Sequence, residues 1–369
     1  MKSIKSKHSV GSLFSGVGGF ELGFKKAGYQ TLWAVENDQH ASTTYKLNFK
    51  NKLIQKDITK ISKKEISSLD SVDVLTAGFP CQAFSIAGYQ KGFEDPRGNL
   101  FLEILRFVRT LQNKPKVLLL ENVRNFYSHD NKRTWETIRS YLKKSGYSYL
   151  PLILNTSRST GIPQNRERAY IVCFLNDNTY VDIPIPLVDE NSILKANQSS
   201  FDLNGNKTES FLNNLKKNIL EEKNNYKDFL EKPNNIDKKY LYKNKDFKTR
   251  AASGEMIYKE LEKKMDSDLF VYQWRRTGEV RVNKKNEVPT LTASMGSGGH
   301  NVPIIKQNKI IRKLTPRECF TFQGFPKSFK IPGNISDNQL YKQAGNAVTV
   351  KLVTKIAKSI KDEINKYDT

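Results

Sequence analysis

The chain has 369 residues and a formal net charge of +23 at pH 7, with a pI of about 9.7. A chain of this length can bury at least one sizeable core, and we expect an α/β domain with a smaller partner domain. So large a positive charge favours a polyanionic partner, because lysine and arginine release counterions when they contact phosphates. Nucleic acid is the leading candidate.

The composition also excludes several classes of protein. No apolar stretch is long enough to span a bilayer, and MKSIKSKHSVGSLFSG lacks the uninterrupted apolar core of a secretory signal. We therefore expect a cytoplasmic protein without a membrane partner. The three cysteines and four histidines are scattered, so the sequence predicts neither a disulfide framework nor a metal site.

From residue 8 to about 185, short β-rich apolar runs alternate with stretches of helical spacing such as NLFLEILRFVRTLQ. The runs are HSVGSLF, YQTLWAVE, KLIQKDI, SVDVLTAG, KVLLLENV and YIVCFL. This alternation predicts βαβ units in a doubly wound, mostly parallel sheet of the α/β class.

The composition changes between residues 188 and 268, where asparagine, lysine and serine dominate and apolar anchors are sparse. This pattern indicates a different, partly helical domain or insertion. Its lysine runs are typical of a solvated face, and direct contact with nucleic acid is the alternative. From about residue 310 apolar periodicity returns, and VTVKLVTKIAKSIKDEI predicts a closing helix.

Ligands of an open parallel sheet bind beyond the carboxyl ends of the strands, so the residues that end each run carry the functional information. The first run continues into SGVGGF, where Gly16, Gly18 and Gly19 allow close backbone approach to a ligand, although such glycines also occur in ordinary tight turns. The second run ends in Glu36, an acceptor for ribose hydroxyls, and the third in Asp57, an acceptor for an adenine amino group. Together they predict an adenosine-containing cofactor.

The next two runs end in Cys81 and Glu121. A thiolate at an exposed sheet edge with nearby cations is a strong nucleophile, whereas a lone cysteine elsewhere is more often a small hydrophobic residue. We apply that second interpretation to Cys173 and Cys319. Glu121 ends the most apolar run, where a partly buried, hydrogen-bonding carboxyl is expected.

Two arginines, Arg166 and Arg168, precede the last run of this region. If that run forms a strand antiparallel to the others, its start lies at the same edge as Cys81 and Glu121.

Seven motifs resemble, in order and approximate spacing, those of the DNA (cytosine-5) methyltransferases of bacterial and phage restriction-modification type. They are FSGVGGF, Glu36, GFPCQAFS, ENV, QNRER, LTPRECFTFQGFP and GNAV. The resemblance covers residues 8 to 175 and 287 to 357, and it implies a Rossmann-like, S-adenosylmethionine-dependent sheet with a smaller target-recognition domain. The implied division is a catalytic and cofactor-binding domain (1–187), a target-recognition domain (188–311), a hinge segment (312–341) and a C-terminal helix that returns to the catalytic domain (342–369).

The resemblance also implies the reaction: transfer of a methyl group from S-adenosylmethionine to C5 of a flipped-out cytosine in a specific short duplex DNA sequence. Cys81 would add to C6, Glu121 would bind N3 and the exocyclic amine, Arg168 would contact the O2 side and Arg166 would support the site. The enzyme would act as a monomer on duplex DNA without a metal, with a restriction endonuclease as a possible partner.

The implied cofactor-binding residues are Phe14, Gly16, Gly18, Gly19, Glu36, Asn37, Asp57, Ile58, Pro80, Asn346 and Val348. The expected DNA-binding residues are Gln82, Ser85, Ile86, Gln273, Arg275, Arg276, Thr290 and Leu291. Glutamine and arginine suit guanine edges, but phosphate contact is an equal alternative for each arginine, and Thr290 and Leu291 could simply form a turn.

Two other functions remain open at this point. A transfer-RNA cytosine-5 methyltransferase built on the same scaffold is one, and the chain does contain Cys319-Phe320-Thr321, although within a segment that the DNA enzymes share. A DNA-binding module that kept the fold but lost activity is the other, and the intact Cys81 and Glu121 argue against it.

Overall fold

A computed structural model describes residues 8–80, 100–175, 188–189, 191, 193, 207–219, 224–242, 255–265, 271–274, 279–283, 286–297 and 301–367. The chain forms two compact units. The first unit comprises Met1–Asn155, Glu167–Leu220 and Val350–Thr369. The second unit comprises Thr156–Arg166 and Glu221–Thr349.

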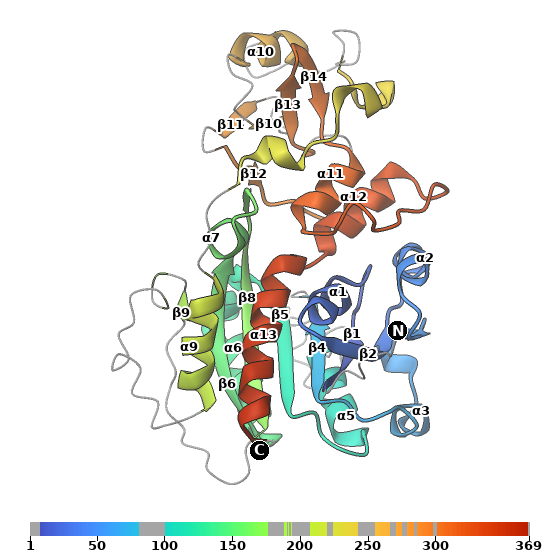
Figure 1. Cartoon of the computed structure of the whole chain (residues 1–369), viewed down its shortest axis with the longest axis vertical. Helices are drawn as coiled ribbons and strands as arrows, with labels where there is room; N and C mark the ends of the chain where they lie inside the picture. Colours follow the sequence, from blue (N-terminus) through green and yellow to red (C-terminus); the bar gives the residue numbers. More distant parts are fainter. Residues whose placement is uncertain are drawn as a thin grey trace. The chain divides into compact units, whose positions relative to one another are not determined.

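The first unit is built on an eight-stranded sheet with the order β3-β2-β1-β4-β5-β8-β6-β9 (Figure 1). Its strands are β1 (His8–Leu13), β2 (Tyr29–Val35), β3 (Lys52–Ile54), β4 (Val74–Gly78), β5 (Val117–Val123), β6 (Tyr147–Asn155), β8 (Glu167–Leu175) and β9 (Val188–Asp189). Strand β8 runs antiparallel to both of its neighbours, and every other pairing in the sheet is parallel. The predicted doubly wound α/β class is confirmed.

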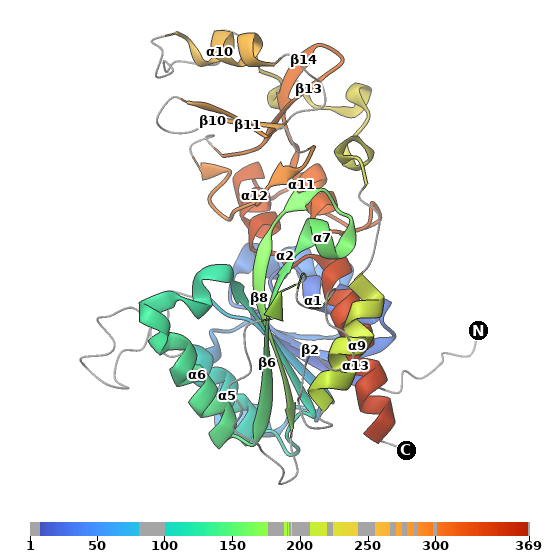
Figure 2. The same ribbon diagram turned by 90° about the vertical axis from the view of Figure 1, so that its left-hand side faces the viewer.

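Helices cover both faces of this sheet. Figure 2 shows α1 (Gly19–Lys26), α9 (Lys207–Ile219) and α13 (Val350–Tyr367) on one face and α5 (Leu100–Thr110) and α6 (Arg133–Lys144) on the other. The other described helical elements of this unit are α2 (Gln39–Asn48), α3 (Lys63–Ser67) and the 3₁₀ turns η1 (Ile58–Lys60), η4 (Arg124–Tyr127) and η5 (His129–Lys132). Because both faces are covered, the strands must be apolar on both sides, and Val117 to Leu120 of β5 are at most 1% exposed.

Strand β6 was not expected from the sequence. It contains Pro151, which argues against a central strand because proline cannot donate a backbone hydrogen bond. The structure accommodates it near the sheet edge: β8 pairs with β6 along its length, whereas β9 pairs only with Leu152 and Ile153.

The second unit contains a four-stranded sheet with the order β11-β10-β13-β14. Its strands are β10 (Val271–Trp274), β11 (Val280–Asn283), β13 (Ile304–Gln307) and β14 (Ile310–Lys313), and their core includes Leu261 and Met265 at α10 (Ile257–Lys264). The rest of the unit consists of α7 (Thr156–Thr160), β7 (Gln164–Asn165), η6 (Tyr226–Phe229), η7 (Pro233–Asn235), η8 (Lys238–Tyr240), β12 (Val288–Pro289), α11 (Pro316–Phe322) and α12 (Asp337–Asn346).

A buried ion pair joins β14 to α11 in the second unit. Arg312 Nη2 lies 2.6 Å from Glu318 Oε1, and both side chains are at most 2% exposed. Glu318 also completes the capping box of α11 with Thr315. Removing one partner would leave a buried charge unpaired, so this pair fixes the orientation of α11 on the sheet.

The packing units do not follow the predicted functional boundaries. Helix α9 lies within the segment 188–311, yet it packs on α13 of the first unit, where Asn218 Nδ2 donates to Ser359 Oγ at 3.0 Å. The assignment of 188–311 to target recognition is a functional prediction and stays one. Within the part of the chain that the structure describes, no helix is long and apolar enough to cross a membrane.

Candidate active site

The loop after β1 combines unusual backbone angles with close packing. Phe14 and Gly16 both have a φ of 55° and Gly18 has a φ of 94°, in the left-handed region. A Cβ on Gly18 would lie 2.1 Å from the Phe49 ring, so only glycine fits there. A Cβ on Gly16 would meet nothing within 4 Å, so the backbone there borders open space that a ligand can approach.

Glu36, directly after β2, organises this loop. Its Oε2 accepts a hydrogen bond from the Gly16 backbone N–H at 2.7 Å, and its Oε1 accepts one from the Asp38 N–H at 2.7 Å. Asp38 in turn caps α2, and Asn37 between them is exposed. Burial raises the pKa of Glu36, and the two N–H donors oppose that rise. The Asn37 N–H also opposes the rise, and a carboxylate with about four lone-pair sites can still accept from another donor.

Asp57 and Ile58 follow β3 at the next sheet position. Asp57 Oδ1 accepts from the Thr59 N–H at 2.9 Å and from Thr59 Oγ1 at 2.8 Å, which caps the turn η1 and lowers the pKa of Asp57. The Ile58 side chain is only 4% exposed and belongs to the hydrophobic core. A cofactor contact by either residue stays a prediction.

The donor and acceptor pattern of these residues fits the adenosine part of S-adenosylmethionine. Ribose hydroxyls and the adenine amino group are donors; Glu36 presents carboxylate oxygens beside the open backbone at Gly16, and Asp57 presents them after the next strand of the sheet. A ligand can approach the Gly16 backbone without displacing a side chain, because a Cβ built there would meet no atom within 4 Å. The residues present therefore fit the cofactor.

Beyond the last backbone pair of β4 and β5, a side-chain hydrogen bond continues the connection between the two chains. The parallel ladder of the two strands ends at the pair Gly78 and Glu121, and Pro80 has no N–H with which to extend it. Asn122, 4% exposed, donates from Nδ2 to the Phe79 carbonyl oxygen at 3.0 Å. Its Oδ1 accepts from the Val123 N–H at 2.8 Å, so the chain that leads to Cys81 is fixed to β5.

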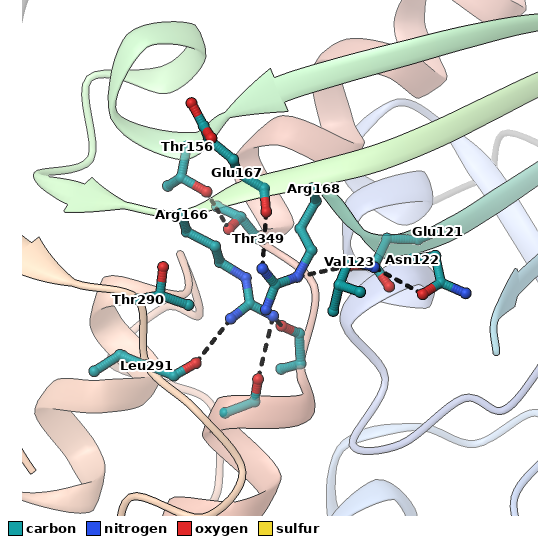
Figure 3. A network of polar contacts seen from close by, with 12 residues as sticks. Glu121, Asn122, Val123, Thr156, Arg166, Glu167, Arg168, Thr290, Leu291 and Thr349 are labelled. Atoms are coloured by element: carbon teal, nitrogen blue, oxygen red, sulfur yellow. Dashed lines mark hydrogen bonds and ion pairs between the residues drawn. The ribbon is translucent and has the colours of Figure 1, made fainter. Parts of the chain in front are cut away.

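Arg168 of β8 meets Glu121 at this edge. Because β8 is antiparallel, Arg168 pairs with Val123, and its Nε lies 3.2 Å from Glu121 Oε1 (Figure 3). The two side chains are 15% and 12% exposed. The predicted condition, that an antiparallel strand brings Arg168 to the edge of Glu121, is fulfilled. The Glu121 carboxyl is thus held by the Arg168 guanidinium at a position largely shielded from solvent. Hydrogen bonds from such a position to a ligand are strong.

Arg166 has different surroundings although it is two residues away in the chain. It belongs to the second unit, is 2% exposed, and donates to the carbonyl oxygens of Leu291, Gly345 and Ala347 (Figure 3). Two residues predicted to shape the cofactor site lie beside these acceptors in the chain. Asn346 is the last residue of α12, and Val348 is 6% exposed. Their role toward the cofactor stays a prediction.

Three predicted DNA-binding residues lie in the described part of the second unit. Gln273 of β10 donates from Nε2 to the Asn301 carbonyl at 3.3 Å, and Thr290 Oγ1 donates to the Asn165 carbonyl at 2.6 Å. Leu291 is 1% exposed. These hydrogen bonds show how Gln273 and Thr290 are anchored to the protein. Contact of the three residues with DNA stays a prediction.

Several predicted residues lie outside the described part of the chain: Cys81, Gln82, Ser85, Ile86, Arg275 and Arg276. The other two cysteines, Cys173 and Cys319, are buried, and burial raises the pKa of both thiols. Their structural interpretation is confirmed. Among the described residues, no group of three or more histidine, cysteine, aspartate or glutamate side chains could hold a metal ion.

Sequence reasoning missed two polar residues at the site. Asn122 could have been found from its place at the end of a buried apolar run, because a buried side-chain amide needs hydrogen-bond partners. Glu21 could have been found as an acidic residue on the apolar face of the helix GFELGFKK. It is 1% exposed, and burial raises its pKa to about 7.

The chain belongs to the C-5 cytosine-specific DNA methylases, whose family model matches residues 8–362. This match confirms the resemblance carried by the sequence motifs and the enzyme class that it implied.

Two curated relatives are similar over nearly their whole length. The chain is 41% identical to the type II methyltransferase M.Bsp6I of a Bacillus species, over 95% of this chain and 98% of the relative. It is 35% identical to the type II methyltransferase M.HhaI of Haemophilus parahaemolyticus, over 99% of both chains.

Solved structures share the fold at lower identity. A DNMT2 variant from Spodoptera frugiperda matches with a TM-score of 0.66 at 21% identity, over 96% of this chain and 99% of that one. The methyltransferase EhMeth of Entamoeba histolytica matches with a TM-score of 0.66 at 20% identity, over 98% and 99%. At these identities the likeness concerns the fold alone.

Proposed function

We propose that this chain transfers a methyl group from S-adenosylmethionine to C5 of a cytosine within a specific short sequence of duplex DNA. The observation that carries the proposal is the Glu121–Arg168 pair at the ends of β5 and β8, beside the strand that leads through Pro80 to Cys81. The two type II methyltransferases among the relatives support a role as the modification enzyme of a restriction-modification system.

The first task of the site is to activate a ring carbon that is a poor nucleophile. Cys81, as the thiolate, adds to C6 of the cytosine and makes the ring electron-rich at C5. Glu121 hydrogen-bonds N3 and the exocyclic amine, which stabilises the activated ring as its charge develops. Loss of the C5 proton after transfer allows the thiol to leave by elimination.

Arg168 has two tasks in this scheme. Its Nε fixes Glu121 Oε1, so the carboxyl is oriented before the base arrives, and its remaining N–H groups are suited to the O2 side of the cytosine. A planar guanidinium presents several donors in fixed directions, so both contacts can be made at once.

The methyl donor binds at the glycine loop in this proposal. When bound, S-adenosylmethionine supplies an electrophilic methyl group. Glu36 and Asp57 accept hydrogen bonds from the adenosine, and Gly16 leaves space at the backbone. Phe14, Gly18, Gly19, Asn37, Ile58, Pro80, Asn346 and Val348 complete or shape the site.

The DNA must present the base outside the helix, because C6 is inaccessible in a stacked duplex, and flipping costs a few kcal/mol. In this proposal the segment 188–311 reads the target sequence, and the protein acts as a monomer with a restriction endonuclease as its partner. The positive charge of the chain supports the phosphate contacts that such binding needs.

Incubation with labelled S-adenosylmethionine and, separately, duplex DNA and transfer RNA tests the proposal. We expect label in duplex DNA, as 5-methylcytosine at one short sequence when the product is mapped by bisulfite sequencing. Label in transfer RNA alone would assign the chain to the alternative substrate, and label in neither would reject the proposal.

A further inference from the structure

Arg166 holds two segments of the second unit that lie far apart in the sequence. Its Nη1 donates to the Leu291 carbonyl at 2.9 Å, and its Nη2 donates to the carbonyls of Gly345 and Ala347 at 3.1 and 3.0 Å (Figure 3). The last two carbonyls belong to the C-terminal end of α12, where intrahelical partners are missing and a cation is favourable.

The peptide of Leu291 is held from both sides. Its N–H donates to Gln164 Oε1 at 3.3 Å, while its carbonyl accepts from Arg166. Gln164 Nε2 lies 3.3 Å from Gln323 Oε1, and Gln323 Nε2 donates to the Ala344 carbonyl at 2.8 Å. This gives a second connection from Leu291 to the end of α12, parallel to the one through Arg166.

The two segments also touch directly. A Cβ on Gly345 would lie 2.2 Å from the carbonyl carbon of Thr292, so the backbone of α12 approaches residues 292–293 as closely as glycine allows. Arg166 is 2% exposed, and a buried cation that loses its acceptors cannot replace them with water. Neither segment can therefore move away from the other without leaving part of the guanidinium unsatisfied.

We propose that Arg166 is a positioning residue that makes cofactor binding and recognition of the target DNA cooperative. The inference rests on the proposed function, which assigns Asn346 and Val348 to the cofactor and Thr290 and Leu291 to the DNA. Asn346, the last residue of α12, lies between Gly345 and Ala347, whose carbonyls Arg166 binds, and Leu291 provides the third carbonyl. A ligand that orders one segment therefore orders the other, and the second ligand binds to a partly ordered site.

Binding linkage measures this cooperativity without any methyl transfer. The unreactive product S-adenosylhomocysteine should raise the affinity for a duplex that contains the mapped target site, and that duplex should raise the affinity for S-adenosylhomocysteine by the same factor. Coupling factors of this kind are typically about 5- to 150-fold. Fluorescence anisotropy of a labelled duplex and calorimetry of the cofactor product measure the two sides independently.

In Arg166→Met, which keeps an unbranched apolar stem but removes the donors and the charge, we expect the coupling factor to fall at least about threefold but not to unity, because the connection through Gln164 and Gln323 remains. Arg166→Lys should recover part of it, since an ammonium retains the charge and can reach some of the carbonyls. The matched control is Arg317→Met. Arg317 donates to the Phe329 carbonyl at 2.6 Å in the same unit, outside both segments, so its loss should leave the coupling factor unchanged.

Thr290→Val keeps the test decisive if Arg166→Met fails to fold. It removes only the bond from Thr290 Oγ1 to the Asn165 carbonyl, from a half-buried side chain, and it should also lower the coupling factor. An unchanged factor in folded Arg166→Met, or in Thr290→Val where the former does not fold, would overturn the inference. If the parental protein binds both ligands but its coupling factor is near unity, the inference is wrong and the proposed function is unaffected. A parental protein that binds neither ligand would overturn both.

Discussion

Arg168 Nε and Glu121 Oε1 lie 3.2 Å apart, on strands that run in opposite directions, with both side chains largely shielded from solvent. This proximity depends on the direction of β8. Because β8 runs antiparallel to β5, the first residues of β8 lie beside the carboxyl end of β5. It places a cation beside the carboxyl that, in the proposed reaction, hydrogen-bonds the cytosine.

The first prediction concerns this pair. Arg168→Ala should lower kcat by about 10²- to 10³-fold, because it removes a preorganised donor and the guanidinium that orients Glu121. DNA binding should weaken much less. Steady-state methylation kinetics with an oligonucleotide duplex provide the measurement. The control is Arg124→Ala: Arg124 pairs with Glu167 near the same edge, but its side chain is 60% exposed, and its loss should change kcat little. Equal losses in the two variants would contradict a special role for Arg168.

A second prediction concerns Glu36. Glu36→Ala should weaken S-adenosylmethionine binding by about 1 to 3 kcal/mol, because it removes a charged acceptor and frees the N–H groups of Gly16 and Asp38. Glu36→Gln retains one acceptor oxygen and should lose less. Calorimetry with the cofactor measures both losses, and DNA affinity without cofactor should barely change. Unaltered cofactor affinity in both variants would make Glu36 a structural residue only.

The third prediction follows from the buried carboxyl of Glu21. Burial raises its pKa from the usual 4.5 to about 7, with a smaller contribution from the like charge of Glu36, while the Ser12 and Ser15 hydroxyls oppose the rise. A raised carboxyl pKa means that the folded state binds the proton more tightly than the unfolded state does. The free energy of unfolding should therefore decrease as pH rises from about 4.5 to about 7, and this loss is complete above that range.

Glu21→Gln imitates the protonated form and removes this dependence. The free energy of unfolding of the variant minus that of the parent should be larger at pH 8 than at pH 5. We expect this increase to be on the order of 3 kcal/mol, since each pKa unit corresponds to about 1.4 kcal/mol. Urea unfolding at the two pH values gives the difference. If the stability difference between parent and variant is the same at both pH values, Glu21 does not titrate in this range.

Much of the first unit could be predicted from the sequence, and the reasons are local. Each run that ends in a candidate site residue became a strand. The glycine loop and Glu36 follow β1 and β2 as expected, whereas β5 continues two residues beyond Glu121 to Val123. These residues lie in continuous apolar segments whose length and boundaries are visible in the sequence. Strand β3 is shorter than its run, because Asp57 turns the chain into η1 by accepting from the Thr59 N–H.

The relationships that depend on contacts distant in the sequence could not be predicted. Nothing near Arg166 indicates that its acceptors are residues 291, 345 and 347, because that geometry arises from the packing of three segments of the second unit. The docking of α9 on α13 is similar: the two helices carry compatible apolar faces, but the sequence does not specify which faces meet.

The fourth prediction concerns specificity. We expect the segment from Tyr272 to Asn301 to contain base-reading residues, with Gln273, Arg275 and Arg276 as the candidates. Alanine substitution of a base reader should relax preference at one position of the site, by about 1 to 3 kcal/mol, whereas loss of a phosphate contact should weaken all sequences alike and lower the salt slope by about one unit.

Bisulfite sequencing of a random-site DNA library after treatment with each variant separates these classes. If all three variants keep the parental site preference and lose only rate, the reading residues lie elsewhere, and the lysine-rich region between residues 188 and 268 becomes the better candidate.

The fifth prediction tests the central claim most directly, that Cys81 attacks a cytosine in duplex DNA. Fluorine in place of the C5 hydrogen prevents the final elimination, so the protein should remain covalently attached to duplex DNA that contains 5-fluorocytosine at the target site when S-adenosylmethionine is present. Peptide mapping by mass spectrometry should locate the adduct at Cys81. Cys81→Ser should form no adduct and transfer no methyl group while still binding DNA. Turnover by Cys81→Ser comparable to that of the parent, or an adduct on another residue, would contradict the account.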